Sequence, residues 1–266
     1  MFIIENMNNY GRFGNQLIYY LNLRKFAKFS NSNWFVPEWS GSQLFNRHGE
    51  SKNFYEKSVI VNRQQVEQIG IENIINISKE FNVLLRPPLL GEVFFDICSE
   101  KAPVEDFLIE KTKVENTAGI HFRGTDFASW NPKAILPSNY YINAIEWICN
   151  QPDQPKEYVI FTDDKSLISI KDVITYLDKS NLKWSFSPNF TDENKTCNFM
   201  KDFIKLSKSK FIISSPSTFS ISAGIISNAK IIHSKEWIDS RNNVNDKFWV
   251  ELYKGGNACY SIYKLI

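Results

Sequence analysis

Histidine and glycine are scarce in this chain of 266 residues, which has three histidines and 11 glycines, so each position is informative. No uncharged apolar run approaches the roughly 18 residues that a membrane-spanning helix requires. The N-terminal residues lack the basic segment and the apolar stretch of about 7–15 residues that mark a secretion signal. These absences predict a cytoplasmic protein with no transmembrane segment.

Closely spaced cysteines and an excess of basic residues are also lacking. The four cysteines do not form the short pairs of a zinc knuckle or a redox CxxC motif, so we expect free, buried thiols; they are Cys98, Cys149, Cys197 and Cys259. Lysine plus arginine (31) nearly balances aspartate plus glutamate (29), giving a net charge of +2. A duplex-DNA binder needs a concentrated basic face, so nucleic acid is not an expected partner.

The composition that is present suits a globular chain with a sizeable core. Hydrophobic residues make up 43% and charged residues 23%, which excludes disorder and fibrous repeats. Aromatic residues reach 15%, with 21 phenylalanines. The length is large for one domain and sufficient for two.

Hydrophobic patterns predict alternating strands and helices in both halves. The first half begins with a strand over 2–5, a helix opening at Asn15-Gln16 and fading near Ser30, and a strand over 34–36. In the stretch 37–113 only helical patches over 63–70 and 71–79 stand out. The second half predicts strands over 117–122, 157–162, 183–186, 211–213 and 230–233, separated by helices over 137–150, 165–179, 198–208 and 219–227. Successive β–α repeats predict a doubly wound parallel sheet, with a boundary between halves in 105–116.

Two glycine- or serine-rich loops lead from a predicted strand into a predicted helix. The first, Gly11 to Gln16, has glycines at Gly11 and Gly14 that would let the backbone approach a ligand. The second, Ser214 to Ser220, offers hydroxyls and backbone N–H groups that suit a phosphate. Each loop taken alone is also explained as an ordinary turn or a Ser/Thr helix cap.

Two charged segments follow neighbouring predicted strands. His121 and Arg123 fall on the same face at the end of the 117–122 strand, and an arginine offers planar donors for a phosphate oxygen. The alternative is a core histidine, with Arg123 paired to Asp126. Asp163 and Asp164 follow the 157–162 strand and could hold a metal, bind a ligand or cap the next helix. Capping suits Asp164 best, and the segment supplies too few ligands for a metal.

All four loops fall at the carboxyl ends of predicted parallel strands, where α/β sheets bind their ligands. Two loops direct backbone dipoles at an anion and one directs an arginine, which favours a nucleotide diphosphate over a neutral metabolite. The sequence has neither a Gly-x-Ser-x-Gly elbow nor a Cys–His pair close together. Nucleotide-sugar transfer is therefore favoured over hydrolysis.

Four ordered motifs resemble those of inverting fucosyltransferases, and most of all the α-1,2-fucosyltransferase family, which is related to α-1,6- and protein O-fucosyltransferases. They are GRFGNQ at 11–16, HFRGTD at 121–126, VIFTDD at 159–164 and DFIKLSKSKFIISSPSTFS at 202–220. The matches cover roughly 2–30 and 117–233.

The resemblance implies an α/β fold of GT-B type, in which two Rossmann-like lobes enclose the active site in the cleft between them. It divides the chain into an acceptor-side lobe over 1–112, a donor-side lobe over 113–240 and a tail over 241–266 that crosses back to the first lobe. The implied reaction transfers L-fucose from GDP-fucose to a glycan hydroxyl by inverting single displacement, with no metal or cofactor required.

Carried over by position, the resemblance assigns roles to individual residues. Arg123 would bind the diphosphate, while His121 and Asp202 would face the guanine. The remaining donor-side residues are Asp163 after the third motif's strand and Ser217, Thr218 and Phe219 around the phosphates. Gly11, Gly14 and Asn15 would bring the first lobe's loop to the cleft.

The chain departs from the family at two positions. Gly124 stands where these families usually have a second arginine, and Ile221-Ser222 replaces an aromatic pair. Another nucleotide sugar, or a catalytically degenerate protein that binds a nucleotide or glycan, therefore stays an alternative. Asp126, just beyond the arginine, is the candidate general base, with orientation of Arg123 as the competing role. The acceptor is not revealed, and Trp34, Trp39 and Trp130 are more typical of core than of sugar stacking.

Overall fold

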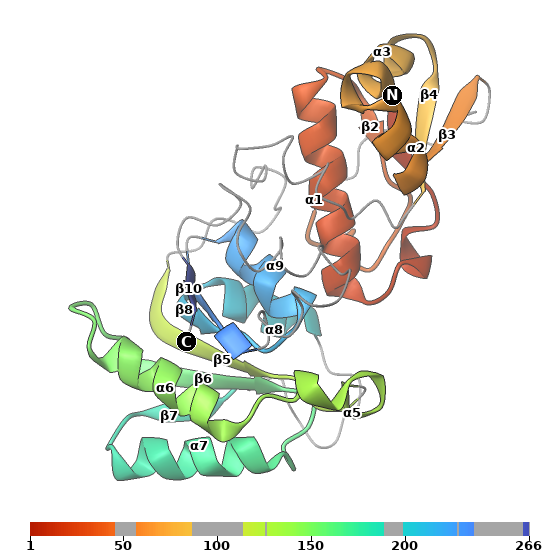
Figure 1. Ribbon diagram of the computed structural model, residues 1–266. Helices are drawn as coiled ribbons and strands as arrows, with labels where there is room; N and C mark the ends of the chain where they lie inside the picture. The colour runs from red at the N-terminus through yellow and green to blue at the C-terminus, as the bar shows by residue number, and fades with distance from the viewer. Residues whose placement is uncertain are drawn as a thin grey trace. The chain divides into compact units, whose positions relative to one another are not determined.

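The structure is a computed structural model that describes residues 1–45, 57–86, 114–125, 127–188, 199–227, 229–236 and 263–265. The chain divides into two compact units, Met1–Lys111 with Asp246–Cys259, and Thr112–Asn245 with Tyr260–Ile266. Each unit contains one parallel sheet with helices packed on it (Figure 1). The predicted α/β class with parallel sheets is confirmed, while the GT-B lobe arrangement and the lobe boundaries stay predictions.

The first unit has a four-stranded parallel sheet in the order β2-β1-β4-β3. Its strands are β1 (Phe2–Ile4), β2 (Trp34–Phe35), β3 (Ser58–Asn62) and β4 (Asn82–Arg86). The helices are η1 (Met7–Asn9), α1 (Phe13–Phe29), α2 (Arg63–Ile69) and α3 (Ile71–Glu80). All three residues of β1 are buried, as expected for a short apolar strand with a neighbour on each side.

Aromatic side chains fill the space between α1 and the loop after β2. Tyr20 on α1 packs edge-on against Trp34, with ring centroids 5.6 Å apart, and stacks on Trp39 at 5.4 Å. Phe13 stacks on the other side of the cluster, 6.0 Å from Trp39. Trp34 and Trp39 are both buried, so these two tryptophans form core, as their sequence context favoured. The Trp130 side chain lies outside what the structure describes.

The second unit has a six-stranded parallel sheet in the order β10-β9-β8-β5-β6-β7. Its strands are β5 (Glu115–Phe122), β6 (Glu157–Thr162), β7 (Trp184–Phe186), β8 (Ser209–Ile213), β9 (Lys230–His233) and β10 (Tyr263–Leu265). Its helices are α5 (Phe127–Trp130), η3 (Pro132–Ala134), α6 (Ser138–Cys149), α7 (Ile168–Lys179), α8 (Phe199–Ser207) and α9 (Thr218–Ile226). In Figure 1, α6 and α7 lie together on one side of this sheet, and α8 and α9 on the other.

This strand order is that of a doubly wound sheet whose chain order reverses between β5 and β8. The first three strands run outward from β5 through β6 to β7, and the chain then returns to β8 on the other side of β5. Such a reversal separates the loops that leave the two central strands, and ligands of open α/β sheets bind there. The most promising place for a ligand in this unit is therefore the end of β5 and β8.

The predicted elements of the second half are confirmed to within a few residues. The clearest difference is α7, which begins at Ile168 and not at Lys165. In the first half, β3 and β4 were missed, and α1 begins at Phe13, two residues before the predicted opening. The boundary predicted in 105–116 falls mostly outside the described residues, as does the tail apart from β10. No helix in the described part of the chain is long and apolar enough to cross a membrane.

Candidate functional site

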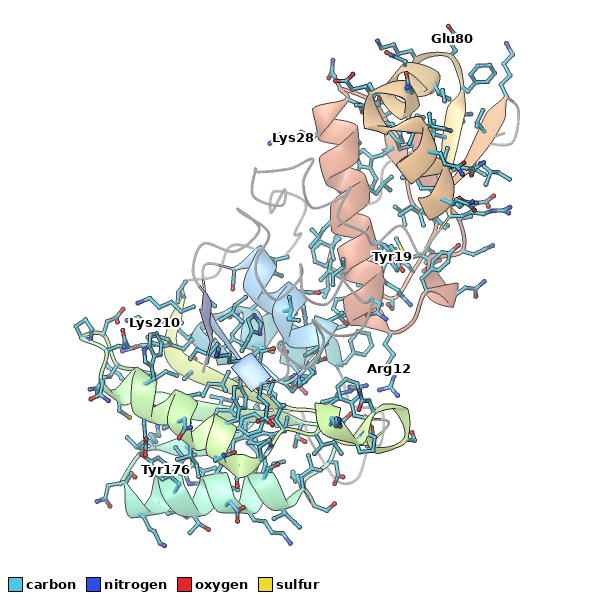
Figure 2. All side chains as sticks on the ribbon, in the orientation of Figure 1. Arg12, Tyr19, Lys28, Glu80, Tyr176 and Lys210 are labelled. Carbon is cyan, nitrogen blue, oxygen red and sulfur yellow. The ribbon has the colours of Figure 1, made fainter. Side chains whose placement is uncertain are left out.

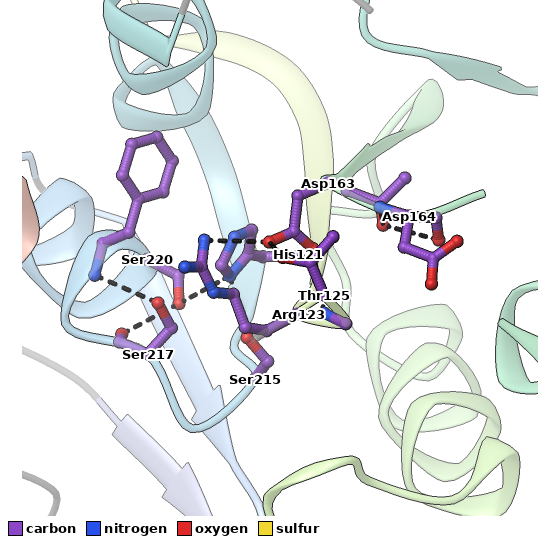
Figure 3. A network of polar contacts seen from close by, with 11 residues as sticks. His121, Arg123, Thr125, Asp163, Asp164, Ser215, Ser217 and Ser220 are labelled. Carbon is purple, nitrogen blue, oxygen red and sulfur yellow. Dashed lines mark hydrogen bonds and ion pairs between the residues drawn. The ribbon is translucent and has the colours of Figure 1, made fainter. Parts of the chain in front are cut away.

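Polar side chains from β5, β6 and β8 gather where these neighbouring strands end (Figure 3). His121 is the second-to-last residue of β5, and Arg123 directly follows this strand. Asp163 directly follows β6. The serine-rich loop Ser214–Ser217 joins β8 to α9. The structure thus brings together three of the four motifs singled out in the sequence.

Asp163 fixes the turn that carries Arg123. One carboxylate oxygen, Oδ2, lies 3.1 Å from Arg123 Nη1 and accepts a hydrogen bond from Thr125 Oγ1 at 2.9 Å. The other oxygen, Oδ1, accepts from the Gly124 backbone N–H at 2.9 Å. Both charged side chains are mostly buried, with 15% of Arg123 and 23% of Asp163 exposed. Arg123 therefore pairs with Asp163 from the adjacent strand, which makes Asp163 a residue that positions the guanidinium.

His121 is buried and held through one ring nitrogen. Its Nδ1 lies 2.9 Å from Ser215 Oγ and 3.1 Å from Ser220 Oγ, so both described hydrogen bonds use that atom. Burial lowers the pKa of His121 to about 4, and the nearby Asp163 carboxylate offsets only part of this effect. The imidazole is therefore neutral near pH 7, and Nε2 is the nitrogen left for a ligand.

The loop between β8 and α9 is held rigidly at both ends. The Tyr140 hydroxyl donates to the carbonyl oxygens of Ser214, at 2.8 Å, and Ile232, at 2.9 Å. The Ser215 N–H donates to the His121 carbonyl, and Ser217 Oγ accepts from the Phe219 N–H at 3.3 Å as the cap of α9. The N-terminus of this nine-residue helix thus presents its partial positive charge at the end of β8.

Aromatic rings connect α8 and α9 to His121. The Phe219 ring lies 5.4 Å from the His121 ring and 5.4 Å from that of Phe203. Asp202, beside Phe203 in the first turn of α8, is buried and accepts a hydrogen bond from the Ser187 hydroxyl. Thr218 is also buried, and its carbonyl accepts from the Ser222 hydroxyl. Of the residues that the resemblance assigns, His121 and Asp202 for the guanine and Phe219 for the phosphates, the structure thus shows His121 and Phe219 in ring contact and Asp202 buried.

The role predicted for Asp164 as a helix cap is wrong. Asp164 Oδ1 accepts from the backbone N–H of Ser166 at 2.8 Å and from its hydroxyl at 2.6 Å, which forms a local turn. This turn occupies the residues before the helix, so α7 starts three residues later with Leu167 at its cap position and no side-chain cap. Asp164 packs against Gly124 instead, and a Cβ added to that glycine would lie 2.8 Å from Asp164 Cβ.

The glycine motif of the first unit forms the turn into α1. Gly11 has a positive φ of 76°, which glycine tolerates, and its carbonyl accepts from Gln16 Nε2 at 2.8 Å. Asn15 covers it closely, because a Cβ on Gly11 would lie 2.4 Å from Asn15 Nδ2. Gly14 and Asn15 fall in the first turn of α1. Figure 2 shows Arg12 at this end of the helix and Lys28 at the other.

The candidate base and the expected independence from a metal stay predictions. Asp126, the candidate base, lies outside the described residues. The described part of the chain contains no group of three or more His, Cys, Asp or Glu side chains that could hold a metal ion. The roles assigned to the other site residues stay predictions.

Sequence reasoning missed the residues that hold the site in place. Thr125, Ser215 and Ser220 lie within quoted motifs, so their hydroxyls could have been found as partners of Asp163 and His121. Tyr140 gave no signal, because its hydroxyl bonds two carbonyls that are distant in the sequence. Ser187 likewise follows a short strand without any motif.

Comparison with known proteins supports the fold and no more. No protein-family model matches the sequence, and no curated protein matches it. A similar solved structure is the crystal structure of POFUT1 in complex with GDP-fucose, with a TM-score of 0.52 and 11% sequence identity. The match covers 86% of this chain and 93% of the other. The two chains therefore share a fold, the fold of a fucosyltransferase that binds GDP-fucose.

Proposed function

We propose that the protein is a glycosyltransferase that moves L-fucose from GDP-fucose to a glycan hydroxyl with inversion. The observation that carries this proposal is that Arg123 and the N-terminus of α9 follow the paired strands β5 and β8, between which the strand order of the second unit reverses. POFUT1, which shares the fold, is bound to GDP-fucose in its crystal structure. The site and the shared fold thus support the same class of substrate.

The diphosphate is the part of the donor that this site suits best. Arg123 supplies planar, charged donors, and the first turn of α9 supplies backbone N–H groups and a partial positive charge. Ser217 and Thr218 lie at that turn, and Ser217 is buried as its cap. Anion binding at such a helix terminus requires no metal, so we include none in the proposed mechanism.

The nucleobase would lie against His121 and Asp202. A neutral imidazole presents one N–H or one lone pair at Nε2, and a carboxylate accepts hydrogen bonds from the N–H groups of a guanine. Because Asp202 and His121 are buried, hydrogen bonds that they make with a base are little weakened by water. This set favours a purine with N–H donors over a uracil.

The proposed reaction is a single displacement at the anomeric carbon. The acceptor oxygen forms a bond to that carbon while the bond to the β-phosphate oxygen breaks, and GDP leaves with one more negative charge. Arg123 and the α9 N-terminus stabilise this growing charge, and donors of this kind are worth roughly 3–4 kcal/mol each in measured enzymes. The proton of the acceptor hydroxyl passes to a general base, for which Asp126 is our candidate.

A second candidate function is that of a nucleotide- or glycan-binding protein without catalysis, and Gly124 is the residue that favours it. Gly124 occupies the position of the second arginine in the resembling families, so one charge near the reacting sugar is absent. Because Gly124 lies near the reacting sugar, the α-1,2 linkage and the identity of the sugar are also proposed and not shown. Slow hydrolysis of a nucleotide sugar separates a transferase from a binding protein.

A donor screen tests the proposal. The protein is incubated with GDP-fucose, GDP-mannose and UDP-sugars, each with and without a panel of glycans, and released nucleotide and products are measured by mass spectrometry. We expect turnover with GDP-fucose, slow without an acceptor and faster with one. Turnover of a UDP-sugar alone would contradict the donor assignment, and nucleotide binding without any turnover would support the binding protein.

A further inference from the structure

Two serines in and after β7 each donate a hydrogen bond to a carboxylate, but toward opposite edges of the sheet. The Ser185 hydroxyl, within β7, donates at 2.8 Å to Oε1 of Glu157, the first residue of β6. The Ser187 hydroxyl, directly after β7, donates to Oδ1 of Asp202 in the first turn of α8. The second pair therefore lies at the carboxyl edge of the sheet, where ligands of α/β sheets bind.

The Ser187–Asp202 pair is enclosed by the protein. Ser187 is 2% exposed and Asp202 is 6% exposed. The backbone of Ser187 is fixed as well, because its N–H donates to the Ile160 carbonyl of β6 at 2.8 Å. A hydrogen bond between buried groups is little weakened by water. The sheet therefore determines where the Ser187 hydroxyl lies, and this hydroxyl in turn holds Oδ1 of Asp202.

The start of α8 packs against the residues of the donor site. Phe203, which follows Asp202, is fully buried, and its ring lies 5.4 Å from that of Phe219. The Phe219 ring lies 5.4 Å from that of His121. Packing thus ties the backbone of Asp202 to His121, the other residue that the proposed function assigns to the base.

The plane of the Asp202 carboxylate needs a partner to hold it. The χ2 torsion of an aspartate is broad and nearly twofold, so the backbone alone does not determine where the two oxygens point. A hydroxyl that donates to Oδ1 selects one of these orientations. A carboxylate has about four acceptor positions, so the group can still accept hydrogen bonds from a ligand.

Guanine is the base whose edge depends most on an oriented carboxylate. Its N1–H and one N–H of its 2-amino group point in the same direction and match the two oxygens of one carboxylate. Hypoxanthine has the N1–H but no 2-amino group, and adenine presents a lone pair at N1, which a carboxylate repels. The 2-amino group adds affinity only when both oxygens face this edge of the base.

We propose that Ser187 is a positioning residue for the donor, which orients the Asp202 carboxylate so that the site selects guanine over bases without a 2-amino group. This inference rests on the proposed function, in which the base of the donor lies against Asp202. All the residues concerned belong to the second unit. If the Ser187 hydroxyl only stabilised the start of α8, its removal would lower stability and leave the selection of the base unchanged.

Calorimetry of the full chain with GDP and with inosine diphosphate, which lacks the 2-amino group, tests the inference. We expect the unchanged protein to bind GDP at least about tenfold more tightly than inosine diphosphate, and Ser187→Ala to reduce this preference to about threefold or less. Ser185→Ala is the matched control, because it removes a serine-to-carboxylate hydrogen bond from the same strand, and it retains the preference. Both Kd values come from one sample, so an incompletely folded fraction does not change their ratio.

Asp202→Asn shows whether Ser187 acts through Asp202. The amide offers one acceptor oxygen in place of two, so we expect the preference for GDP to be lost. Adding Ser187→Ala to Asp202→Asn should then change the preference no further. Ser187→Cys, whose thiol is a weak donor, should lose the preference as Ser187→Ala does, and it serves if the alanine variant does not fold.

Three results in the variants would overturn the inference and leave the proposed function standing. They are an unchanged preference in Ser187→Ala, an equal loss in Ser185→Ala, and a further loss when Ser187→Ala is added to Asp202→Asn. Equal binding of GDP and inosine diphosphate by the unchanged protein would overturn it too. An unchanged protein that binds neither nucleotide would instead contradict the proposed function.

Discussion

At the scale of single residues, the position of the Arg123 guanidinium depends on its neighbour Asp163. The carboxylate contacts Arg123 and also accepts from Gly124 N–H and Thr125 Oγ1, so it orders the whole turn before a ligand binds. Preorganised charges stabilise an anion at a lower reorganisation cost than mobile ones. The same carboxylate repels a phosphate, so its geometric and electrostatic effects oppose each other.

Substitutions of Asp163 separate these two effects. Asp163→Ala removes the turn's hydrogen bonds, and we expect the Kd for GDP to rise about tenfold. Asp163→Asn keeps an oxygen that accepts from Gly124 N–H and removes the repulsive charge, so we expect a Kd within about threefold of the unchanged protein. Calorimetry measures both, and an equal loss in the two variants would show that the carboxylate binds the ligand directly.

The buried histidines make stability depend on pH. Burial lowers the pKa of His121 to about 4 and that of His233 to about 3, below the value of about 6.5 in an unfolded chain. Below about pH 6.5 the unfolded chain binds protons that the folded protein does not, so stability falls as the pH falls. From pH 7 to pH 5 we expect each histidine to reduce the free energy of unfolding by about 2 kcal/mol.

Urea unfolding at several pH values checks this expectation. In His121→Asn the loss of stability that the two described histidines cause between pH 7 and pH 5 should be halved, because of these two His233 alone still contributes. A free energy of unfolding that does not change over this range would mean that neither imidazole is held neutral in the fold.

Residue types and motif spacing located Arg123, His121 and Ser217 at one sheet edge, but the partners of these residues could not be predicted. Arg123 forms an ion pair with Asp163, which follows the neighbouring strand 40 residues on, whereas Asp126, the partner considered from the sequence, lies outside the described residues. Ser215 and Ser220 bond His121 across more than 90 residues. Such pairs depend on strand order and register, which periodicity does not contain.

At the scale of elements, the Arg123 turn packs closely on the residues before α7, which explains why a glycine occupies position 124. A Cβ there would lie 2.8 Å from Asp164 Cβ and 3.1 Å from Leu167 Cδ1. A Cβ moves only with its backbone, so the turn or the loop after β6 would have to shift. The arginine found at this position in the resembling families therefore does not fit the present loop.

We expect Gly124→Ala to lower the free energy of unfolding by about 1–3 kcal/mol, because it overpacks this contact. The shifted turn should also weaken GDP binding. Chemical unfolding and calorimetry measure the two effects. Gly70→Ala is not a suitable control because Gly70 has a positive φ, so Lys179→Ala, at an exposed position on α7, serves instead. Unchanged stability in Gly124→Ala would mean that the loop adapts without strain.

Most helices and strands of the second half were predictable because they have a clear apolar period bounded by polar residues, whereas the short α5, η3 and β10 were missed. The strand β6 is a continuous buried run, and α8 places Phe203 and Leu206 on one face. In the first half, β3 and β4 were missed. The exposure of β3 alternates weakly, and β4 directly follows α3 with one residue between them. Both strands have only five residues, and β3 lies at the edge of the sheet while β4 lies between β1 and β3, so neither carries much pattern to detect.

At the scale of the whole molecule, the order of strands in the second unit determines where the candidate site lies. The reversal between β5 and β8 selects one place on the sheet, and Arg123, His121 and the α9 N-terminus all lie there. The sequence predicted parallel β–α repeats but not the order of the strands. One part of that order, the pairing of the C-terminal β10 with β9, involves a strand that the sequence did not predict. The class of fold could therefore be predicted, whereas the reversal that defines the site required the structure.

Calorimetric titration with GDP of the unchanged protein, Arg123→Met and Lys171→Met tests the central claim most directly. Methionine keeps an unbranched, flexible side chain and removes the charge, and Lys171 is an exposed cation on α7, outside the site. We expect Arg123→Met to weaken GDP binding about a hundredfold, or roughly 3 kcal/mol, and Lys171→Met to bind GDP as the unchanged protein does. Equal GDP affinity in all three proteins would contradict the central claim.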